Sequence, residues 1–332
     1  MMCTRTRFHR IALVFALLAL AGCKKSNTGA DAADAMRDGV RLIDKGDRPR
    51  QELRYDIAAG TTTTSTTTFR VATLATAEGS EAATVTLLPG LRLDIVSGPA
   101  ERTEAGVKYE VDVVKSEAIV PPDFSDDLGK QLRDGAALAQ NIGGWVEVDD
   151  RGRVLSGELN QRTKRSDVPV RLVRMIVNTR ETLTRVRLPE EKVGLGARWE
   201  SRKTVKAYGF DIQQVSTYTL VDRVGHELML NVTIQQLAVP QTIEFPEEGI
   251  TISVQSMTGQ AEGQIVLDLR ALESDASATG SGEDHILVKT PEGAESIDIS
   301  EEFEVQVANT TSLGGSAPVP DDSKARRRDR RR

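Results

Sequence analysis

The sequence predicts an α+β fold, with one large twisted antiparallel sheet of about eight to eleven strands and two main helices packed on one side of it. Apolar and polar residues alternate through residues 52–120 and again through 199–307, which is the pattern of half-buried strands. Residues 123–142 and 167–186 instead repeat their apolar positions at helical spacing. Because the strands come in runs, an α/β alternation is excluded. So large a sheet usually curls or splits, and two sub-domains that meet near residue 188 are the alternative.

The first run of strands predicts an antiparallel meander. Residues 108–114 alternate cleanly between apolar and polar side chains. The threonine-rich run at 61–68 predicts a solvated strand, because threonine is β-branched and tolerates a partly solvated pleated surface. Glycosylation of this run is the alternative. Pro89-Gly90 stands between two apolar runs and predicts a turn.

Two helices are expected between the two runs of strands. Asp123 or Ser125 would cap the first and Gly143-Gly144 would end it. Both helices are expected to pack an apolar face on the sheet, although a basic amphipathic helix at 167–186 could also lie on a membrane. The apolar stripe of the first helix comprises Phe124, Leu128, Leu132, Ala136, Ala139 and Ile142. The polar face of the second carries Arg171, Arg174, Arg180 and Arg185.

Glycines mark the turns of the second half. Acidic residues followed by Gly152 predict a hairpin turn, with Gly152 in the left-handed conformation, and the ligand spacing of a calcium loop is absent there. A loop is predicted to begin at Pro189 and to end at Trp199, where a series of long strands would start. Gly259 and Gly263 predict a bend or bulge within one of them.

The first 23 residues predict secretion and lipidation. Residues 1–10 carry three arginines and no acid, and residues 11–22 are almost wholly apolar. That apolar run is too short to cross a bilayer, which takes about twenty residues. It ends in Leu20-Ala21-Gly22-Cys23, which resembles the bacterial lipoprotein signal, in which small residues precede a cysteine that becomes the lipidated N-terminus. The resemblance implies a mature chain that starts at Cys23 and carries several acyl chains there, palmitate among them.

Such an anchor would hold the protein firmly, because each buried CH₂ group contributes about 0.8 kcal/mol and several chains add together. Lipoproteins that stay at the inner membrane often have an aspartate directly after the cysteine, whereas Lys24 and Lys25 follow it here. By that resemblance we expect a cell-envelope protein at the outer membrane, facing the periplasm, with surface display as the alternative.

Composition divides the chain into four parts. Residues 1–22 are the signal peptide, and residues 23–50, rich in Ala, Asp, Lys and Gly, predict the lipidated N-terminus and a flexible tether. A short helix within the tether is the alternative. Residues 51–310 are expected to form the α+β domain, and 311–332 a disordered basic tail. The tail would either contact anionic lipid headgroups or remain solvated.

The composition also limits the chemistry. The net charge of the whole chain is −6, and it becomes more negative once the signal arginines are removed, so there is no basic field for nucleic acid. Cys3 is lost with the signal and Cys23 is taken by lipid, which leaves no cysteine for a disulfide, a metal or catalysis.

No enzyme motif appears, and we expect no catalytic site, no metal and no cofactor. His226 and His285 lack the spacing of metal ligands. Carboxylates adjacent in sequence, as in Asp126-Asp127, Glu247-Glu248 and Glu301-Glu302, point to opposite faces when they lie on a strand, so nothing in the sequence makes two of them converge.

Two turn motifs carry a second resemblance. Asp149, Gly152 and Val154 form a D-x-x-G-x-V hairpin, and a P-x-x-x-V-x-x-G-x-x-W loop comprises Pro189, Val193, Gly196 and Trp199. Together with the order of strands and helices, these motifs resemble a group of uncharacterised bacterial envelope lipoproteins over residues 51–310. The resemblance brings no catalytic residues with it.

Two non-enzymatic functions follow as hypotheses. In the first, the domain is a binding or structural module that meets another envelope component through its sheet or its strand edges. In the second, it is a carrier or receptor that holds a lipid or another lipophilic molecule in a cavity between sheet and helices. Aromatic residues are only 4% of the chain, which favours the first hypothesis.

Overall fold

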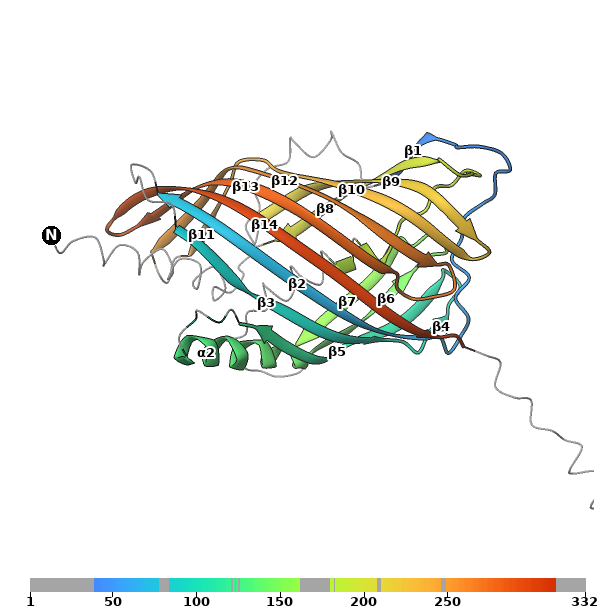
Figure 1. Cartoon of the computed structure of the whole chain (residues 1–332), viewed down its shortest axis with the longest axis horizontal. Coiled ribbons are helices and arrows are strands. Elements are labelled where there is room, and N and C mark those ends of the chain that lie inside the picture. Colours follow the sequence, from blue (N-terminus) through green and yellow to red (C-terminus); the bar gives the residue numbers. More distant parts are fainter. Residues whose placement is uncertain are drawn as a thin grey trace, which may run out of the picture.

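The computed structural model describes residues 39–77, 84–120, 122, 124, 126–161, 180–181, 183–207, 210–245 and 249–314. These residues form a single antiparallel sheet of 14 strands, together with helix α2 (Figure 1). The first seven strands are β1 (Gly39–Asp44), β2 (Thr62–Ala77), β3 (Thr84–Ser97), β4 (Glu101–Arg102), β5 (Val107–Ile119), β6 (Ile142–Val148) and β7 (Val154–Gln161). The other seven are β8 (Arg198–Ala207), β9 (Phe210–Val224), β10 (Glu227–Ala238), β11 (Gln241–Phe245), β12 (Ile250–Asp268), β13 (Asp275–Thr290) and β14 (Gly293–Ser312).

The sheet joins both halves of the chain. Its order is β1-β8-β9-β10-β12-β13-β14-β2-β3-β5-β6-β7, with β11 paired to β12 and β4 paired to β5 beside this path. The last strand, β14, pairs with β2 along the whole length of β2, from Ala77 opposite Ile297 to Thr62 opposite Ser312. Strands from before and after residue 188 therefore belong to one sheet.

One face of the curled sheet is buried. Alternate residues of the central strands contribute to a large apolar cluster, in which Leu93, Ile265 and Leu230 have 0% exposure. Trp199 is fully buried in this cluster, stacks on Tyr218 with ring centroids 5.6 Å apart, and donates a hydrogen bond from Nε1 to the Arg187 carbonyl at 2.9 Å. The predicted placement of this tryptophan at the start of a strand is confirmed.

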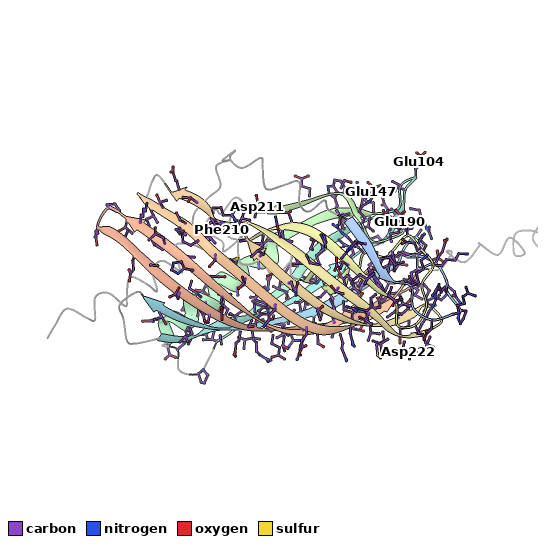
Figure 2. All side chains as sticks on the ribbon, turned by 90° about the horizontal axis from the view of Figure 1, so that it is seen from above. Glu104, Glu147, Glu190, Phe210, Asp211 and Asp222 are labelled. Carbon is purple, nitrogen blue, oxygen red and sulfur yellow. The ribbon has the colours of Figure 1, made fainter. Side chains whose placement is uncertain are left out.

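A second apolar cluster contains Phe210, Ile286, Ile297 and Ile299. Figure 2 places Phe210 away from the end of the molecule where Glu190 and Asp222 lie. On β13 and β14, the first cluster includes Ala278 and Phe303 and the second includes Ile286 and Ile299, and the inward-facing residues Asp284 and Glu301 between them belong to neither cluster.

The predicted α+β class is wrong, because the protein is nearly all β. The first predicted helix forms only as α2 (Asp126–Ala137), followed by a 3-10 turn at Leu138–Asn141. Gly143 and Gly144 do not end it; they lie in β6 and pair with β5. The apolar residues that follow Gly144 favour a strand, and the two glycines become part of it. The pairing of this strand with β5 outweighs the tendency of the glycines to end a helix.

Most of the second predicted helix, 167–186, lies outside the described residues. Its last turn is helical at Arg180, Glu181, Leu183 and Thr184. Arg180 and Arg185 are not on a solvated face as predicted: Arg180 is 4% exposed, and the Arg185 side chain is 12% exposed.

Pro89-Gly90 is not a turn either. Strand β3 runs straight through it, with a shift of register opposite Phe69 and Val71. Proline lacks the N–H that a regular ladder needs, so it is tolerated at a bulge. A Cβ atom at Gly90 would lie 2.8 Å from the Phe69 carbonyl oxygen, so this close approach of two strands requires glycine.

Some of the other turn and strand predictions are confirmed and others are wrong. Gly152 has φ of 78°, in the predicted left-handed conformation, in the turn between β6 and β7. The threonine-rich run forms β2, but Thr63 and Thr67 are fully buried rather than solvated. The bulge in β12 falls at Val254 and not at the two predicted glycines.

The edges of the domain differ from the predicted boundaries. Strand β1 pairs with β8 and lies within the segment predicted as a tether. Strand β14 extends to Ser312, two residues beyond the predicted end of the domain. The signal peptide, Cys23 and most of the basic tail lie outside the described residues. Within the part of the chain that the structure covers, no helix is long and apolar enough to cross a membrane.

Candidate functional site

The residues singled out in the sequence are not brought together. Cys23 lies outside the described residues, so its lipidation stays a prediction. His226 lies in the exposed turn between β9 and β10. His285 Nδ1 lies 2.6 Å from Asp298 Oδ1 on the neighbouring strand. Among the described residues there is no group of three or more His, Cys, Asp or Glu side chains that could hold a metal ion.

The adjacent carboxylates separate as predicted where they lie on a strand. Glu301 faces the buried side of β14, whereas Glu302 is exposed on the other side. Asp126 and Asp127 instead lie in the first turn of α2, where negative charge complements the helix dipole. Glu247-Glu248 lies outside the described residues.

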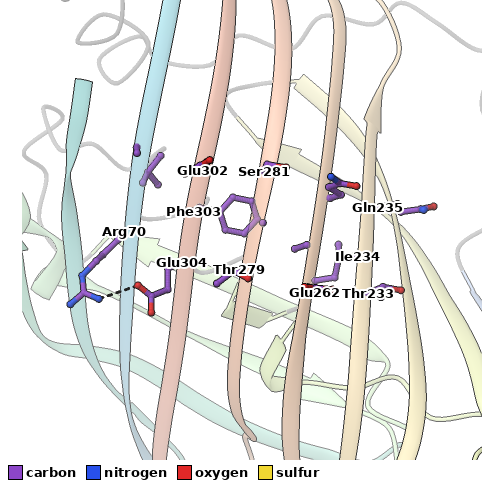
Figure 3. A pocket seen from close by; sticks show the side chains of 15 residues that line it. Arg70, Thr233, Ile234, Gln235, Glu262, Thr279, Ser281, Glu302, Phe303 and Glu304 are labelled. Carbon is purple, nitrogen blue, oxygen red and sulfur yellow. Dashed lines mark hydrogen bonds and ion pairs between the residues drawn. The ribbon is translucent and has the colours of Figure 1, made fainter. Parts of the chain in front are cut away.

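A cavity of about 840 Å³ lies against the middle of the sheet (Figure 3). It is lined by three consecutive residues from each of the neighbouring strands β10, β12, β13, β14 and β2. In each strand the middle residue belongs to the buried face, as Ile234 and Phe303 do, and its two neighbours face the opposite side. We call this cavity the sheet hollow.

The side chains of the sheet hollow that face away from the buried side are polar or small. They are Arg70, Ala72, Thr233, Gln235, Gln260, Glu262, Thr279, Ser281, Glu302 and Glu304. A second cavity of about 460 Å³ continues along the same strands and shares Thr233, Glu262, Thr279 and Glu304 with the first. The two cavities form one elongated polar depression.

The hollow has an acidic character. Arg70 Nη1 lies 3.1 Å from Glu304 Oε2, so this arginine is neutralised locally (Figure 3). Glu262 and Glu302 make no ion pair with any described residue, and both are exposed. The arrangement suits a partner that presents cationic or hydrogen-bond-donating groups.

Two acids lie on the opposite, buried face of the same strands. Burial and repulsion from Glu301 raise the pKa of Asp284 to about 7, and burial raises the pKa of Glu301. Sequence reasoning missed this pair, although Glu301 interrupts an inward-facing series of β14 that is otherwise apolar, comprising Ile297, Ile299, Phe303, Val305 and Val307.

The last helical turn before β8 carries a buried ion pair. Arg180 pairs with Glu273, and Arg180 Nη2 also donates a hydrogen bond to Ser65 Oγ at 2.8 Å. Ser97 Oγ donates a hydrogen bond of 2.5 Å to Glu273 Oε1. Burial alone would raise the pKa of Glu273, but the Arg180 charge and the hydrogen bond from Ser97 hold it below its ordinary value.

A second buried arginine lies beside this pair. Arg185 donates a hydrogen bond to the Tyr109 hydroxyl, and its Nη1 lies 3.5 Å from Glu181 Oε1. Ser274 is bound to the same turn, since its N and its Oγ both donate to the Thr184 carbonyl, at 3.1 and 3.0 Å. These contacts attach the turn to the segment that follows β12, so we assign the cluster a structural role.

Comparison with known proteins adds little. No family model matches the chain, and no curated protein matches it in sequence. Among solved structures, 75% of the chain is similar to 98% of Acinetobacter baumannii OccAB4, with 6% identity and a TM-score of 0.21. Likewise, 73% of the chain is similar to 99% of a mutant porin of Rh. blastica, with 8% identity and a TM-score of 0.20. Likenesses this weak carry no weight for the fold or the function of this protein.

Proposed function

We propose that the protein is a non-enzymatic envelope lipoprotein, anchored through acylated Cys23 at the outer membrane, that binds another envelope component through the exposed face of its sheet. The observation that carries the second part is the sheet hollow, which spans five neighbouring strands and is lined by polar side chains that face away from the buried side. A broad, polar, solvent-facing depression on a rigid sheet suits a macromolecular or strongly hydrated partner.

The same geometry argues against a lipid carrier. The lining of the sheet hollow comes from strands alone and contains the carboxylates Glu262, Glu302 and Glu304, which an acyl chain would desolvate at a cost. Within the larger apolar cluster of the buried face, side chains such as Leu93 and Ile265 are already packed with 0% exposure, so this cluster offers no surface to a lipophilic ligand.

Cross-linking in cells tests the binding surface. A photoreactive amino acid in place of Ser281, at the centre of the sheet hollow, is expected to capture one envelope component, because Ser281 faces the depression. The same amino acid in place of Glu110, exposed on β5, is the control and should not capture it. The double substitution E262K/E302K should abolish capture and leave the melting temperature unchanged. Equal capture from both positions would contradict the proposal, and a lipid that copurifies in native mass spectrometry would favour the carrier.

Replacement of Cys23 tests the anchor. Cys23→Ala is expected to leave the protein soluble or unprocessed, because no other cysteine follows the signal and firm attachment requires acyl chains. Membrane fractionation and mass spectrometry of the N-terminus measure this. Cys3→Ala, within the signal, is the matched control and should give normal, acylated protein. Acylated, membrane-bound protein from Cys23→Ala, or native protein with a free Cys23 thiol, would contradict the proposed anchor.

A further inference from the structure

We propose that Asp284, Glu301 and Thr73 form a binding site for a hard divalent cation of the calcium type on the buried face of the sheet. The three residues come from three neighbouring strands, β13, β14 and β2. Register places Glu301 directly opposite Thr73 on one side and opposite Gly282 on the other. Asp284 follows Gly282 on the same face, so it is the diagonal neighbour of Glu301.

The carboxylates lack a protein partner. Among the described residues, neither Asp284 nor Glu301 makes a hydrogen bond or an ion pair, although both are half-buried. Two acids that approach one another with no cation between them repel, unless a proton or a metal ion separates their charges. A bound cation would remove this repulsion.

Thr73 gives a second and independent indication. Its side chain is 3% exposed, and its Oγ1 atom has no hydrogen-bond partner among the described residues. Buried hydroxyl groups normally find a partner. Register places Thr73 directly opposite Glu301, so its side chain and the carboxylate lie side by side on the same face of the sheet. A cation held by the two acids would give this hydroxyl a partner.

The residues around the two carboxylates are small or apolar, and the oxygen ligands favour one type of cation. A Cβ atom added to Gly282, opposite Glu301, would meet the Thr258 carbonyl oxygen at 3.3 Å and no side chain within 4 Å, so no described side chain lies directly over this glycine. The neighbouring inward residues Ile286 and Ile299 are apolar and provide no competing charge. Carboxylate and hydroxyl oxygens are ligands for hard cations, and Ca²⁺ tolerates an irregular oxygen set completed by water.

Calcium titration of the full mature protein in detergent tests the site. At pH 8, isothermal calorimetry with CaCl₂ is expected to show saturable binding of one ion per chain. D284N/E301Q should lower the affinity at least tenfold, and Thr73→Val should weaken it by a smaller factor. The matched control is E283Q/E302Q, which neutralises the outward-facing neighbours on the same two strands and should bind as the wild type does.

The folded state of each variant is checked by its melting temperature without calcium. D284N/E301Q removes a repulsive pair, so its melting temperature should equal or exceed that of the wild type. Absence of saturable binding to the folded wild type up to about 5 mM Ca²⁺, the weak end of protein calcium sites, would overturn the proposal. Equal weakening by E283Q/E302Q would overturn it as well, because the ion would then lie on the exposed face.

Discussion

Glu273→Gln is expected to destabilise the folded protein by about 3–5 kcal/mol, the typical cost of removing one partner of a buried ion pair. The carboxylate is 2% exposed and neutralises Arg180, which is itself 4% exposed. Glutamine keeps the size of the side chain but leaves the buried guanidinium of Arg180 without its ion-pair partner. Urea denaturation followed by circular dichroism measures the loss as a lower midpoint with an unchanged slope.

Two further variants separate the charge effect from packing. In Arg180→Met combined with Glu273→Leu, both charges are replaced by apolar groups, and most of the lost stability should return. Glu304→Gln breaks the exposed pair with Arg70 and should cost less than about 1 kcal/mol. If Glu273→Gln costs no more than Glu304→Gln, the buried pair does not support the fold as we argue.

Local patterns predicted the strands and some of the turns correctly. Period-two alternation located the long strands that follow Trp199, and acids followed by Gly152 indicated the left-handed turn between β6 and β7. In both cases residues close in sequence determine the structure. The helical content was overestimated, because the tertiary pairing of Gly143 and Gly144 with β5 depends on a strand that local propensity does not report.

The buried polar groups could not be predicted in the same way. Arg180 has the spacing of a solvated helical face, and only the approach of Glu273, 93 residues later in the chain, makes its burial possible. Asp284, Glu301 and Thr73 meet through the registers of β13 with β14 and of β14 with β2, which alternation alone does not specify. Glu301 is an acid at an inward-facing position of an otherwise apolar strand. In the sequence, such a residue is a local signal of a polar site on the buried face of the sheet.

Ionisation of Asp284 should lower the stability of the calcium-free protein as the pH rises from 4 to 8. Its pKa is 3.8 in a model peptide and about 7 in the folded protein, so folding favours the protonated carboxyl. This contribution is complete below pH 4 and is lost as the pH rises through 7. A rise in the pKa of this size corresponds to roughly 4 kcal/mol.

Comparison with Asp284→Asn isolates this contribution from those of carboxyls such as Glu273, whose pKa shifts in the opposite direction. Asparagine cannot ionise, so the variant should lack the loss of stability that Asp284 causes. The free energy of unfolding of Asp284→Asn minus that of the wild type, measured by urea denaturation in EDTA, should therefore rise by several kcal/mol between pH 4 and pH 8. Glu283→Gln, on the exposed face, should differ from the wild type by a nearly constant amount. A flat difference for Asp284→Asn would mean that the Asp284 carboxyl is solvated, and the repulsion from Glu301 that makes a cation favourable between them would then be absent.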